Sequence, residues 1–311
     1  MKTFNDFKII GIDHGYGNMK TANHCFKTGI AGFDEEPLFT RNMLIYDGRY
    51  YLIGEEHKEF LAEKDADNDY YCLTLVAIAK ELRTAGLSEA NIIIAAGLPL
   101  TWTSGQKKAF REYLLQKDEV EFIYQNIRYH IHIADVKVYP QGYSAVAPFA
   151  SSLKGLCLLA DIGNGTMNTL YLANGRPQSG KMFTEKFGTH QCTLAIREGF
   201  MRKTRRELNE IIIDEILCNG TADIPKDDLH IITAIAENYV KEIFARLREH
   251  GYDENTMHLI VTGGGGCLLK HFGNINQSKV TFVEDICAAA KGYECLADVY
   301  LRAEAKNEGR V

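Results

Sequence analysis

The sequence lacks an apolar run long enough to cross a membrane, and residues 1–8 contain no apolar signal region. It also lacks any Cys-x-x-Cys pair, although it has 8 cysteines. Several cysteines lie inside apolar segments, as Cys157 does between Leu156 and Leu158. Reduced, mostly buried thiols explain this distribution better than disulfides or zinc sites do. We therefore expect a cytoplasmic protein without a membrane segment.

The chain also lacks an excess of positive charge. Its formal net charge is −6 and its pI is about 6.0, which argues against direct binding of nucleic acid along a broad surface. At 311 residues and 46% apolar content it can bury a large core, and we expect two domains. We interpret one local basic stretch as a solvated helix face: Arg197, Arg202, Lys203, Arg205 and Arg206.

Two segments almost 150 residues apart repeat one pattern. Residues 9–20 form an apolar strand that ends in Asp13 and breaks into glycines, and residues 156–166 do the same around Asp161. Glycine-rich turns let backbone N–H groups converge on an anion. An aspartate beside those amides would repel a bare phosphate, but it suits a divalent cation held between the two. The repeat therefore predicts two half-sites for one metal–polyphosphate ligand.

Strands alternate with helices in both halves of the sequence, which predicts an α/β fold with an internal repeat. Helices are expected over residues 69–85, 104–115, 189–203, 204–217, 228–250 and 286–305, and a connecting helix is expected to open at Gln141. Strands are expected over residues 8–13, 19–26, 43–46, 49–53, 91–96, 120–124, 127–133, 137–139, 156–161, 166–173, 258–262 and 279–283.

The order of these motifs resembles the actin/Hsp70/hexokinase ATPase superfamily. Its two phosphate loops are matched by Asp13-x-Gly15-x-Gly17-Asn18-x-Lys20 and by Asp161-x-Gly163-Asn164-Gly165-Thr166. Its adenosine motif is matched by Val261-Thr262-Gly263-Gly264-Gly265, and its second connecting segment by residues 288–293. Within the superfamily the chain most resembles the bacterial ParM/StbA plasmid-segregation ATPases. Three features carry this likeness: the short length, residues 96–101 and residues 138–142.

This resemblance implies two duplicated, ribonuclease H-like domains around a central nucleotide cleft. Domain I would comprise residues 1–150 plus 288–311, and domain II residues 151–287. Asp13 and Asp161 would reach the Mg²⁺ ion of the nucleotide through water, as the matching aspartates of the family do. The phosphates would be bound by Gly15, Gly17, Asn18, Lys20, Gly163, Asn164, Gly165 and Thr166, and the nucleoside by Gly263, Gly264 and Gly265.

Gln141 occupies the position where actin-like ATPases keep the residue that orients the attacking water. A glutamine takes no proton at neutral pH, so it would position the water rather than act as a base. Many ParM-like proteins have glutamate here, whereas actin has glutamine. The simpler interpretation of Gln141 is a role at the start of a helix.

Other charged residues are weaker candidates. For the base and ribose we considered Glu185, Lys186 and Arg197, but ordinary surface charge is the favoured interpretation of each. Residues 284–286 lack the proline that many relatives have after the corresponding aspartate. The small residues at 288–292 would allow two helices to cross closely and act as a hinge between the domains.

The resemblance implies a filament-forming ATPase in plasmid segregation that hydrolyses ATP or GTP with Mg²⁺. Its partners would be further copies of itself and a ParR-like DNA-binding adaptor, with no direct contact to nucleic acid or membrane. One alternative is a small-molecule kinase of the same fold, although no obvious carboxylate stands at the position of Gln141. Another is a non-polymerising chaperone or scaffold ATPase, although no appended peptide-binding domain is evident.

Overall fold

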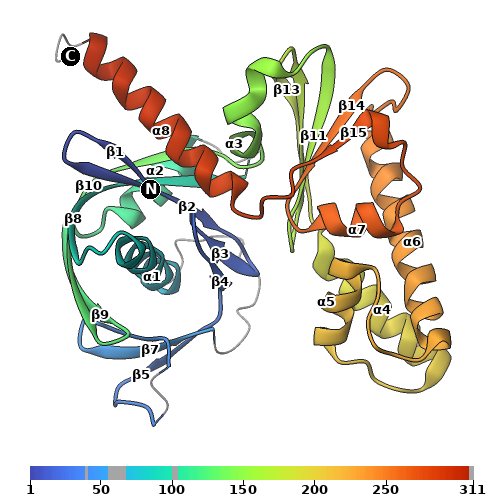
Figure 1. The fold of residues 1–311 in the computed structure, drawn as a ribbon, viewed down its shortest axis with the longest axis horizontal. Helices are drawn as coiled ribbons and strands as arrows, with labels where there is room; N and C mark the ends of the chain where they lie inside the picture. Colours follow the sequence, from blue (N-terminus) through green and yellow to red (C-terminus); the bar gives the residue numbers. More distant parts are fainter. Residues whose placement is uncertain (39–40, 55–67, 100–103, 308–311) are drawn as a thin grey trace. The chain divides into compact units, whose positions relative to one another are not determined.

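The computed structural model describes the chain except for residues 39–40, 55–67, 100–103 and 308–311. Two residues of the segment 96–101, Leu100 and Thr101, therefore lie outside the described residues. The chain divides into two compact units, which are described separately (Figure 1). Unit 1 comprises Met1–Phe149 and Cys287–Val311, and unit 2 comprises Ala150–Ile286. Whether these units correspond to actin-like domains I and II stays a prediction.

Unit 1 is built on a 10-stranded mixed sheet with β2, β8 and β10 side by side and parallel. Figure 1 shows the sheet curving around α1 (Asp69–Thr84), which is buried along most of its length. The strands are β1 (Lys2–Phe4), β2 (Phe7–His14), β3 (Asn18–Lys20), β4 (Cys25–Lys27), β5 (Ile30–Phe33), β6 (Met43–Tyr46), β7 (Arg49–Ile53), β8 (Glu89–Leu98), β9 (Glu119–Tyr124) and β10 (Ile127–Pro140). The helices α2 (Ser104–Leu114), α3 (Tyr143–Val146) and α8 (Ala288–Asn307) complete the unit.

Unit 2 contains a 5-stranded mixed sheet in the order β13-β12-β11-β14-β15. Four helices and two short 3₁₀ turns, η1 (Ala147–Ser152) and η2 (Gln277–Lys279), accompany it, with η1 beginning in unit 1. The strands are β11 (Leu156–Ile162), β12 (Met167–Ala173), β13 (Arg176–Glu185), β14 (His258–Thr262) and β15 (Val280–Phe282). The helices are α4 (Thr189–Thr204), α5 (Glu210–Asn219), α6 (Lys226–Glu249) and α7 (Gly265–Phe272).

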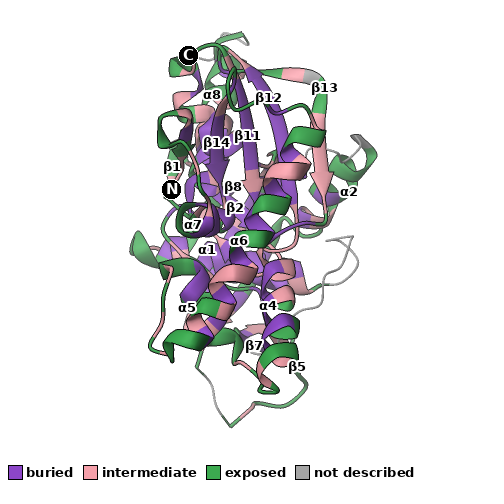
Figure 2. Cartoon of the chain, turned by 90° about the vertical axis from the view of Figure 1, so that its right-hand side faces the viewer, coloured by how far each residue is buried: buried purple, intermediate pink, exposed green. Residues whose placement is uncertain are grey.

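Each unit places its aspartate strand in the same local setting. β2 lies between parallel β8 and antiparallel β3, and β11 lies between parallel β14 and antiparallel β12. Figure 2 colours β2, β8, β11 and β14 largely as buried, as expected for central strands covered on both faces. The predicted α/β fold class is confirmed.

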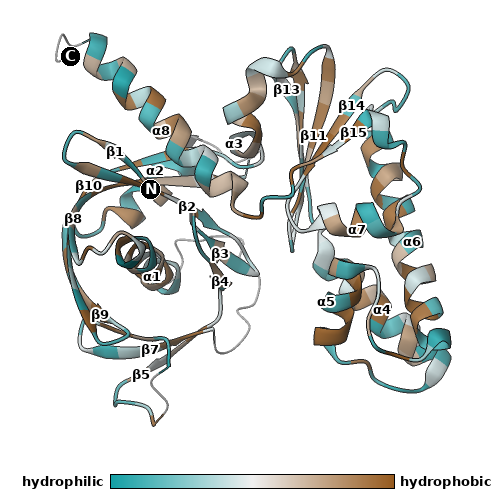
Figure 3. Ribbon diagram, viewed as in Figure 1, coloured by the Kyte–Doolittle hydropathy of each residue, from teal (hydrophilic) through white to brown (hydrophobic). Residues whose placement is uncertain are grey.

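Helix α8 packs closely against β2 and α3. Figure 3 shows it as alternating hydrophilic and hydrophobic bands, the pattern of an amphipathic helix. A Cβ atom at Gly11 would lie 2.0 Å from the carbonyl oxygen of Ala290, and one at Gly292 would lie 1.8 Å from that of Ser144. The predicted close crossing at residues 288–292 is therefore confirmed, whereas its role as a hinge stays a prediction.

Two strand predictions are wrong. The expected strand 19–26 is two strands, because a turn closed by the bond from Thr21 N to His24 O separates β3 from β4. The expected strands 127–133 and 137–139 are one strand, β10, with an irregularity between Ile133 and Asp135. Such a bulge bends a strand without ending it.

One helix start was predicted wrongly, and one helix was not predicted. Gln141 does not open a helix: it precedes Gly142, whose φ of 79° is left-handed, and α3 begins only at Tyr143. Helix α7 was not expected, because Gly264 and Gly265 at its start have low helix propensity. Among the described residues, no helix combines the length and apolarity needed to span a bilayer.

Candidate functional site

The end of β2 brings three predicted residues together in unit 1. Asp13 is 9% exposed, and the hairpin register places Lys20 opposite it on β3. Lys20 Nζ lies 3.7 Å from Asp13 Oδ2. Gln141 Nε2 donates a hydrogen bond of 3.4 Å to Asp13 Oδ1. A carboxylate, an ammonium group and an amide separated by up to 128 positions in sequence thus share one location.

The glycine turn that follows Asp13 is braced by one threonine. Thr28 donates its hydroxyl to Gly15 O at 2.9 Å and its backbone N–H to Gly17 O at 3.2 Å. A Cβ atom at Gly15 would lie 2.4 Å from Asn18 O, so the turn requires glycine there. Asn18 is exposed at the end of the turn. We call residues 13–20 loop 1.

Gln141 is held in place by its backbone. Its N–H donates to Leu98 O at 2.8 Å, which fastens the end of β10 to the end of β8. The side chain is half-buried and directed to Asp13 by the hydrogen bond described above. This geometry fits a residue that orients a small ligand beside Asp13.

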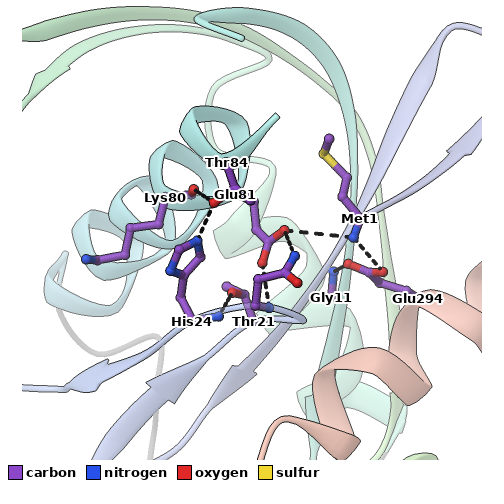
Figure 4. Close-up of polar contacts among 9 residues, drawn as sticks. Met1, Gly11, Thr21, His24, Lys80, Glu81, Thr84 and Glu294 are labelled. Atoms are coloured by element: carbon purple, nitrogen blue, oxygen red, sulfur yellow. Dashed lines mark hydrogen bonds and ion pairs between the residues drawn. The ribbon is translucent and has the colours of Figure 1, made fainter. Parts of the chain in front are cut away.

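Two buried carboxylates, Glu294 and Glu81, both face the N-terminal ammonium of Met1 (Figure 4), and each bonds backbone on one side of loop 1. Glu294 on α8 accepts the N–H of Gly11 at 3.2 Å and lies 3.1 Å from the N-terminal ammonium of Met1. Glu81 on α1 accepts two hydrogen bonds from Asn23, both at 2.9 Å, and lies 3.8 Å from the same ammonium. They fix β2 two residues before Asp13 and the turn after Lys20.

The two carboxylates titrate differently. Burial raises the pKa of Glu294 more than the ammonium and the Gly11 amide lower it. Burial also acts to raise the pKa of Glu81, but hydrogen bonds from Thr21 and Asn23 outweigh it and hold that pKa below its ordinary value. No sequence pattern pointed to either residue.

In unit 2, the segment 161–166 forms a second closed turn, which we call loop 2. Asp161 stands near the end of β11, opposite Asn168 on β12 and Thr262 on β14. Gly163 N donates to Thr166 O at 2.8 Å and closes the turn.

The start of α4 holds this turn. Thr189 N donates to Gly163 O at 3.0 Å and His190 N to Asn164 O at 2.9 Å, while Thr189 Oγ1 donates to Asn164 Oδ1 at 3.3 Å. The first amides of α4 are therefore used by loop carbonyls. Gly165 and Thr166 are half-buried, and Thr166 Oγ1 accepts a 3.5 Å contact from Asn168 Nδ2.

The glycine segment after β14 lies beside loop 2. Gly263 has a φ of 84°, and a Cβ atom there would lie 2.5 Å from Ile162 O and 2.9 Å from Asp161 Oδ1. A Cβ atom at Gly265 would lie 2.3 Å from Ile162 Cγ2. At Gly264, by contrast, a Cβ atom would meet nothing within 4 Å. The structure thus brings the second aspartate and the predicted adenosine motif together.

The weaker candidates behave as ordinary structural or surface charges. Glu185 accepts hydrogen bonds from Arg246, at 2.6 Å, and from His250. Burial acts to raise the pKa of Glu185, but these two partners hold it below its ordinary value. Lys186 and Arg197 are exposed. In the basic stretch, Arg206 pairs with Asp228 at 2.5 Å, and cations near the C-terminus of α4 suit its dipole.

A cavity of about 540 Å³ also lies in unit 2, between α6 and the segment that follows α7. Phe244, Tyr252 and Phe272 line it together with Lys241 and Arg248. None of the predicted site residues borders it. We place the candidate site at the two loops rather than at this cavity, because the loops hold the predicted aspartates, Asp13 and Asp161, next to glycine turns.

The described residues contain no cluster of three or more histidine, cysteine, aspartate or glutamate side chains that could hold a metal ion by itself. Each loop carries a single aspartate, whereas the protein itself supplies three or four ligands to a zinc ion. This donor set is compatible with Mg²⁺, which keeps several waters and takes one or two carboxylates plus substrate phosphates. Asp13 in unit 1 and Asp161 in unit 2 each offer one carboxylate of this kind.

Comparison with known proteins agrees with this description. Residues 11–143 match the family model for the N-terminal domain of actin-like proteins, whereas no curated protein sequence matches significantly. The archaeal actin homolog Ta0583 matches with a TM-score of 0.77 at 18% identity, covering 94% of this chain and 99% of that chain. Its complex with ADP matches with a TM-score of 0.73 at 19% identity, with the same coverage.

Two ParM structures are also similar. The apo psk41 ParM protein has a TM-score of 0.72 at 15% identity, covering 96% of this chain and 99% of that chain. A 15-stranded ParM filament from Clostridium botulinum has a TM-score of 0.71 at 18% identity, covering 94% and 99%. Residues 11–143 are therefore similar to the N-terminal domain of actin-like proteins, and the structural matches show the actin-like fold over most of the chain.

Proposed function

We propose that this protein is a filament-forming actin-like ATPase that binds Mg²⁺ with ATP or GTP, hydrolyses the nucleotide and acts in plasmid segregation. The observation that carries the proposal is the repeated site geometry. In each unit a central strand ends in an aspartate and a closed glycine turn, with Gln141 bonded to Asp13 in one unit and Gly263 beside Asp161 in the other.

In this proposal both loops bind the same nucleotide. The amides of loops 1 and 2 and the ammonium of Lys20 would contact phosphate oxygens. Asp13 and Asp161 would hold Mg²⁺ through water, and the metal would neutralise charge that develops on the phosphates. The glycine backbone at 263–265 would approach the nucleoside, since Gly264 leaves open space beside it.

Gln141 would orient the attacking water. Its Nε2 donates to Asp13, which leaves its Oε1 to accept a hydrogen bond from the water. Because a glutamine amide cannot accept the proton at neutral pH, Gln141 would contribute positioning alone. Hydrolysis would then be slow and would depend on the exact placement of the amide.

The ADP complex of Ta0583 and the ParM filament support nucleotide binding and self-association as the properties to test first. A ParR-like adaptor would carry the contact to DNA, which is consistent with the net charge of −6. We also propose a cytoplasmic location, which a segregation filament requires.

The direct experiment measures 90° light scattering and phosphate release together after Mg²⁺–ATP or Mg²⁺–GTP is added to the purified protein. We expect scattering to rise and then decay as phosphate appears. Gln141→Ala should prolong the plateau, because hydrolysis slows while binding is kept. Gln277→Ala, an exposed glutamine in η2, is the matched control and should leave both traces unchanged.

Three outcomes would contradict parts of the proposal. Phosphate release without scattering or pelletable material would contradict filament formation and favour a non-polymerising ATPase. Phosphate transfer to a small-molecule hydroxyl would favour the kinase alternative. Failure to bind either nucleotide would overturn the whole assignment, because the two-loop geometry is its basis.

A further inference from the structure

The backbone of Gly188, between β13 and α4, is held on both sides of its Cα atom. Its N–H donates to Gln191 Oε1 at 2.7 Å, and its carbonyl oxygen accepts the hydroxyl of Tyr239 at 2.7 Å. A Cβ atom at Gly188 would lie 2.3 Å from Asn164 O, so its backbone packs directly on loop 2. The next two amides, of Thr189 and His190, bond the carbonyls of loop 2. The place of Gly188 therefore sets the place of the loop.

Tyr239 is itself fixed. It projects from α6, is 5% exposed, and its ring stacks on Phe187 with centroids 4.5 Å apart and planes 14° apart. The guanidinium of Arg246 lies 4.1 Å from the Phe187 ring centroid and pairs with Glu185 at 2.6 Å. Burial raises the pKa of Tyr239, so its hydroxyl keeps its proton and acts as the donor. Tyr239 is therefore held by ring stacking as well as by its hydrogen bond.

We propose that Tyr239 is a positioning residue for the phosphate-binding backbone of loop 2. Its hydroxyl holds Gly188 O, and through Gly188 and the first amides of α4 it keeps residues 163–166 in the conformation that receives a phosphate. This inference rests on the proposed function, since it takes loop 2 to contact phosphate rather than the nucleoside. Tyr239 touches no ligand in this role.

The chain offers a matched control. Tyr171 on β12 is 4% exposed, and its hydroxyl also donates to a backbone carbonyl, that of His250, at 2.7 Å. That bond holds the C-terminal end of α6 and not Gly188. Tyr239→Phe and Tyr171→Phe each remove one buried hydroxyl from unit 2. Only Tyr239→Phe removes a bond to Gly188, so the comparison separates the general effect of a lost hydrogen bond from an effect on loop 2.

The experiment measures the dissociation constants of the triphosphate and of its nucleoside, each with Mg²⁺, by competition against a fluorescent triphosphate. Wild type, Tyr239→Phe and Tyr171→Phe are compared, and denaturant unfolding without nucleotide measures the stability of each. We expect Tyr239→Phe to weaken triphosphate binding about threefold to tenfold, the effect of one hydrogen bond, with nucleoside binding unchanged. Tyr171→Phe should change neither, although it should lose similar stability.

An unchanged ratio of triphosphate to nucleoside affinity in Tyr239→Phe would overturn the inference. So would an equal change of that ratio in Tyr171→Phe, since the effect would then follow general stability. Wild-type protein that binds neither ATP nor GTP would instead contradict the proposed function itself. The two failures are therefore distinguishable in one set of titrations.

Discussion

The two loops share a pattern but differ in what supports them. Besides Thr28, loop 1 has two supports that titrate: Glu294 accepts the N–H of Gly11, and Glu81 accepts hydrogen bonds from Asn23 beyond Lys20. Loop 2 is supported by neutral groups. These are the amides of Thr189 and His190, and Gly188, whose backbone is bonded by Gln191 and Tyr239. The same strand-and-turn device can thus be stabilised by buried charge or by a helix terminus.

The difference has a consequence for how each loop responds to change. Buried carboxylates make the support of loop 1 depend on pH, since their pKa values are displaced in opposite directions. The support of loop 2 consists of close backbone contacts, and Gly188 and Gly263 leave no room there for a Cβ atom. Loop 1 should therefore be sensitive to protonation as well as to added volume, whereas loop 2 should be sensitive to added volume alone.

The largest effect is expected from removing either aspartate. Asp13→Asn and Asp161→Asn should each lower the rate of phosphate release by about 100-fold to 1000-fold, as loss of an electrostatic stabiliser typically does. If both loops serve one metal, the double variant should be little worse than the weaker single variant. Asp6→Asn, on the exposed turn between β1 and β2, is the control. Additive losses, or a loss from one aspartate alone, would show that the loops do not share a ligand.

Added volume at the glycines gives the second effect. Gly188→Ala would place Cβ 2.3 Å from Asn164 O and Gly15→Ala 2.4 Å from Asn18 O, so each should lower the free energy of unfolding by about 1–3 kcal/mol. Gly266 lies inside α7, and a Cβ atom there would meet no atom closer than 3.8 Å. Gly266→Ala should therefore not lower the free energy of unfolding. Urea unfolding checks all three. A stable Gly188→Ala would mean that α4 can move away from loop 2.

Much of this site was predictable because its pattern is local. An apolar strand, an aspartate and a glycine turn lie within about ten residues, so loops 1 and 2 could be identified from their own sequence. Helix α1 was equally accessible, since Gly86 ends it with a φ of 69° and an N–H bonded to Arg83 O. Local propensity and local hydrogen bonding fix such elements.

The supports could not be predicted, because they depend on contacts between distant residues. Glu294 and Gly11 are 283 positions apart, and Tyr239 and Gly188 are 51 apart. Helix α7 was missed for the same reason. Its glycines favour a loop locally, but packing against Ile162 selects glycine and the helix together. Burial of one carboxylate or one tyrosine leaves no periodic signal.

The third effect tests the titratable support of loop 1 by comparing Glu81→Gln with Glu294→Gln. Glu81 has a lowered folded pKa, so its stabilisation is present above the ordinary glutamate pKa and is lost as pH falls through the lower value. Glu81→Gln should cost about 1–3 kcal/mol at pH 7 and less in acid. Glu294 has a raised folded pKa, so its stabilisation is present in acid and is lost as pH rises through the higher value.

The measurement is urea unfolding from pH 4 to pH 7.5 for wild type and both variants. The stability gap to wild type should widen with rising pH for Glu81→Gln and narrow for Glu294→Gln. Parallel profiles would mean that the two carboxylates act as one pair with the Met1 ammonium, and the assigned opposite shifts would be wrong. Tyr239→Phe, a neutral change at loop 2, should give a gap that is independent of pH over this range.

The smallest effect is expected at Gly264, and it separates folding from binding. A Cβ atom there meets nothing within 4 Å, so Gly264→Ala should change the free energy of unfolding by less than about 0.5 kcal/mol. If a nucleoside approaches this backbone, the added methyl group should still weaken nucleotide binding several-fold. Gly266→Ala, two residues further along the same segment, should leave binding unchanged. Equal affinity in the two variants would place the nucleoside elsewhere, whereas a selective loss at Gly264 would show that the space was kept open for a ligand.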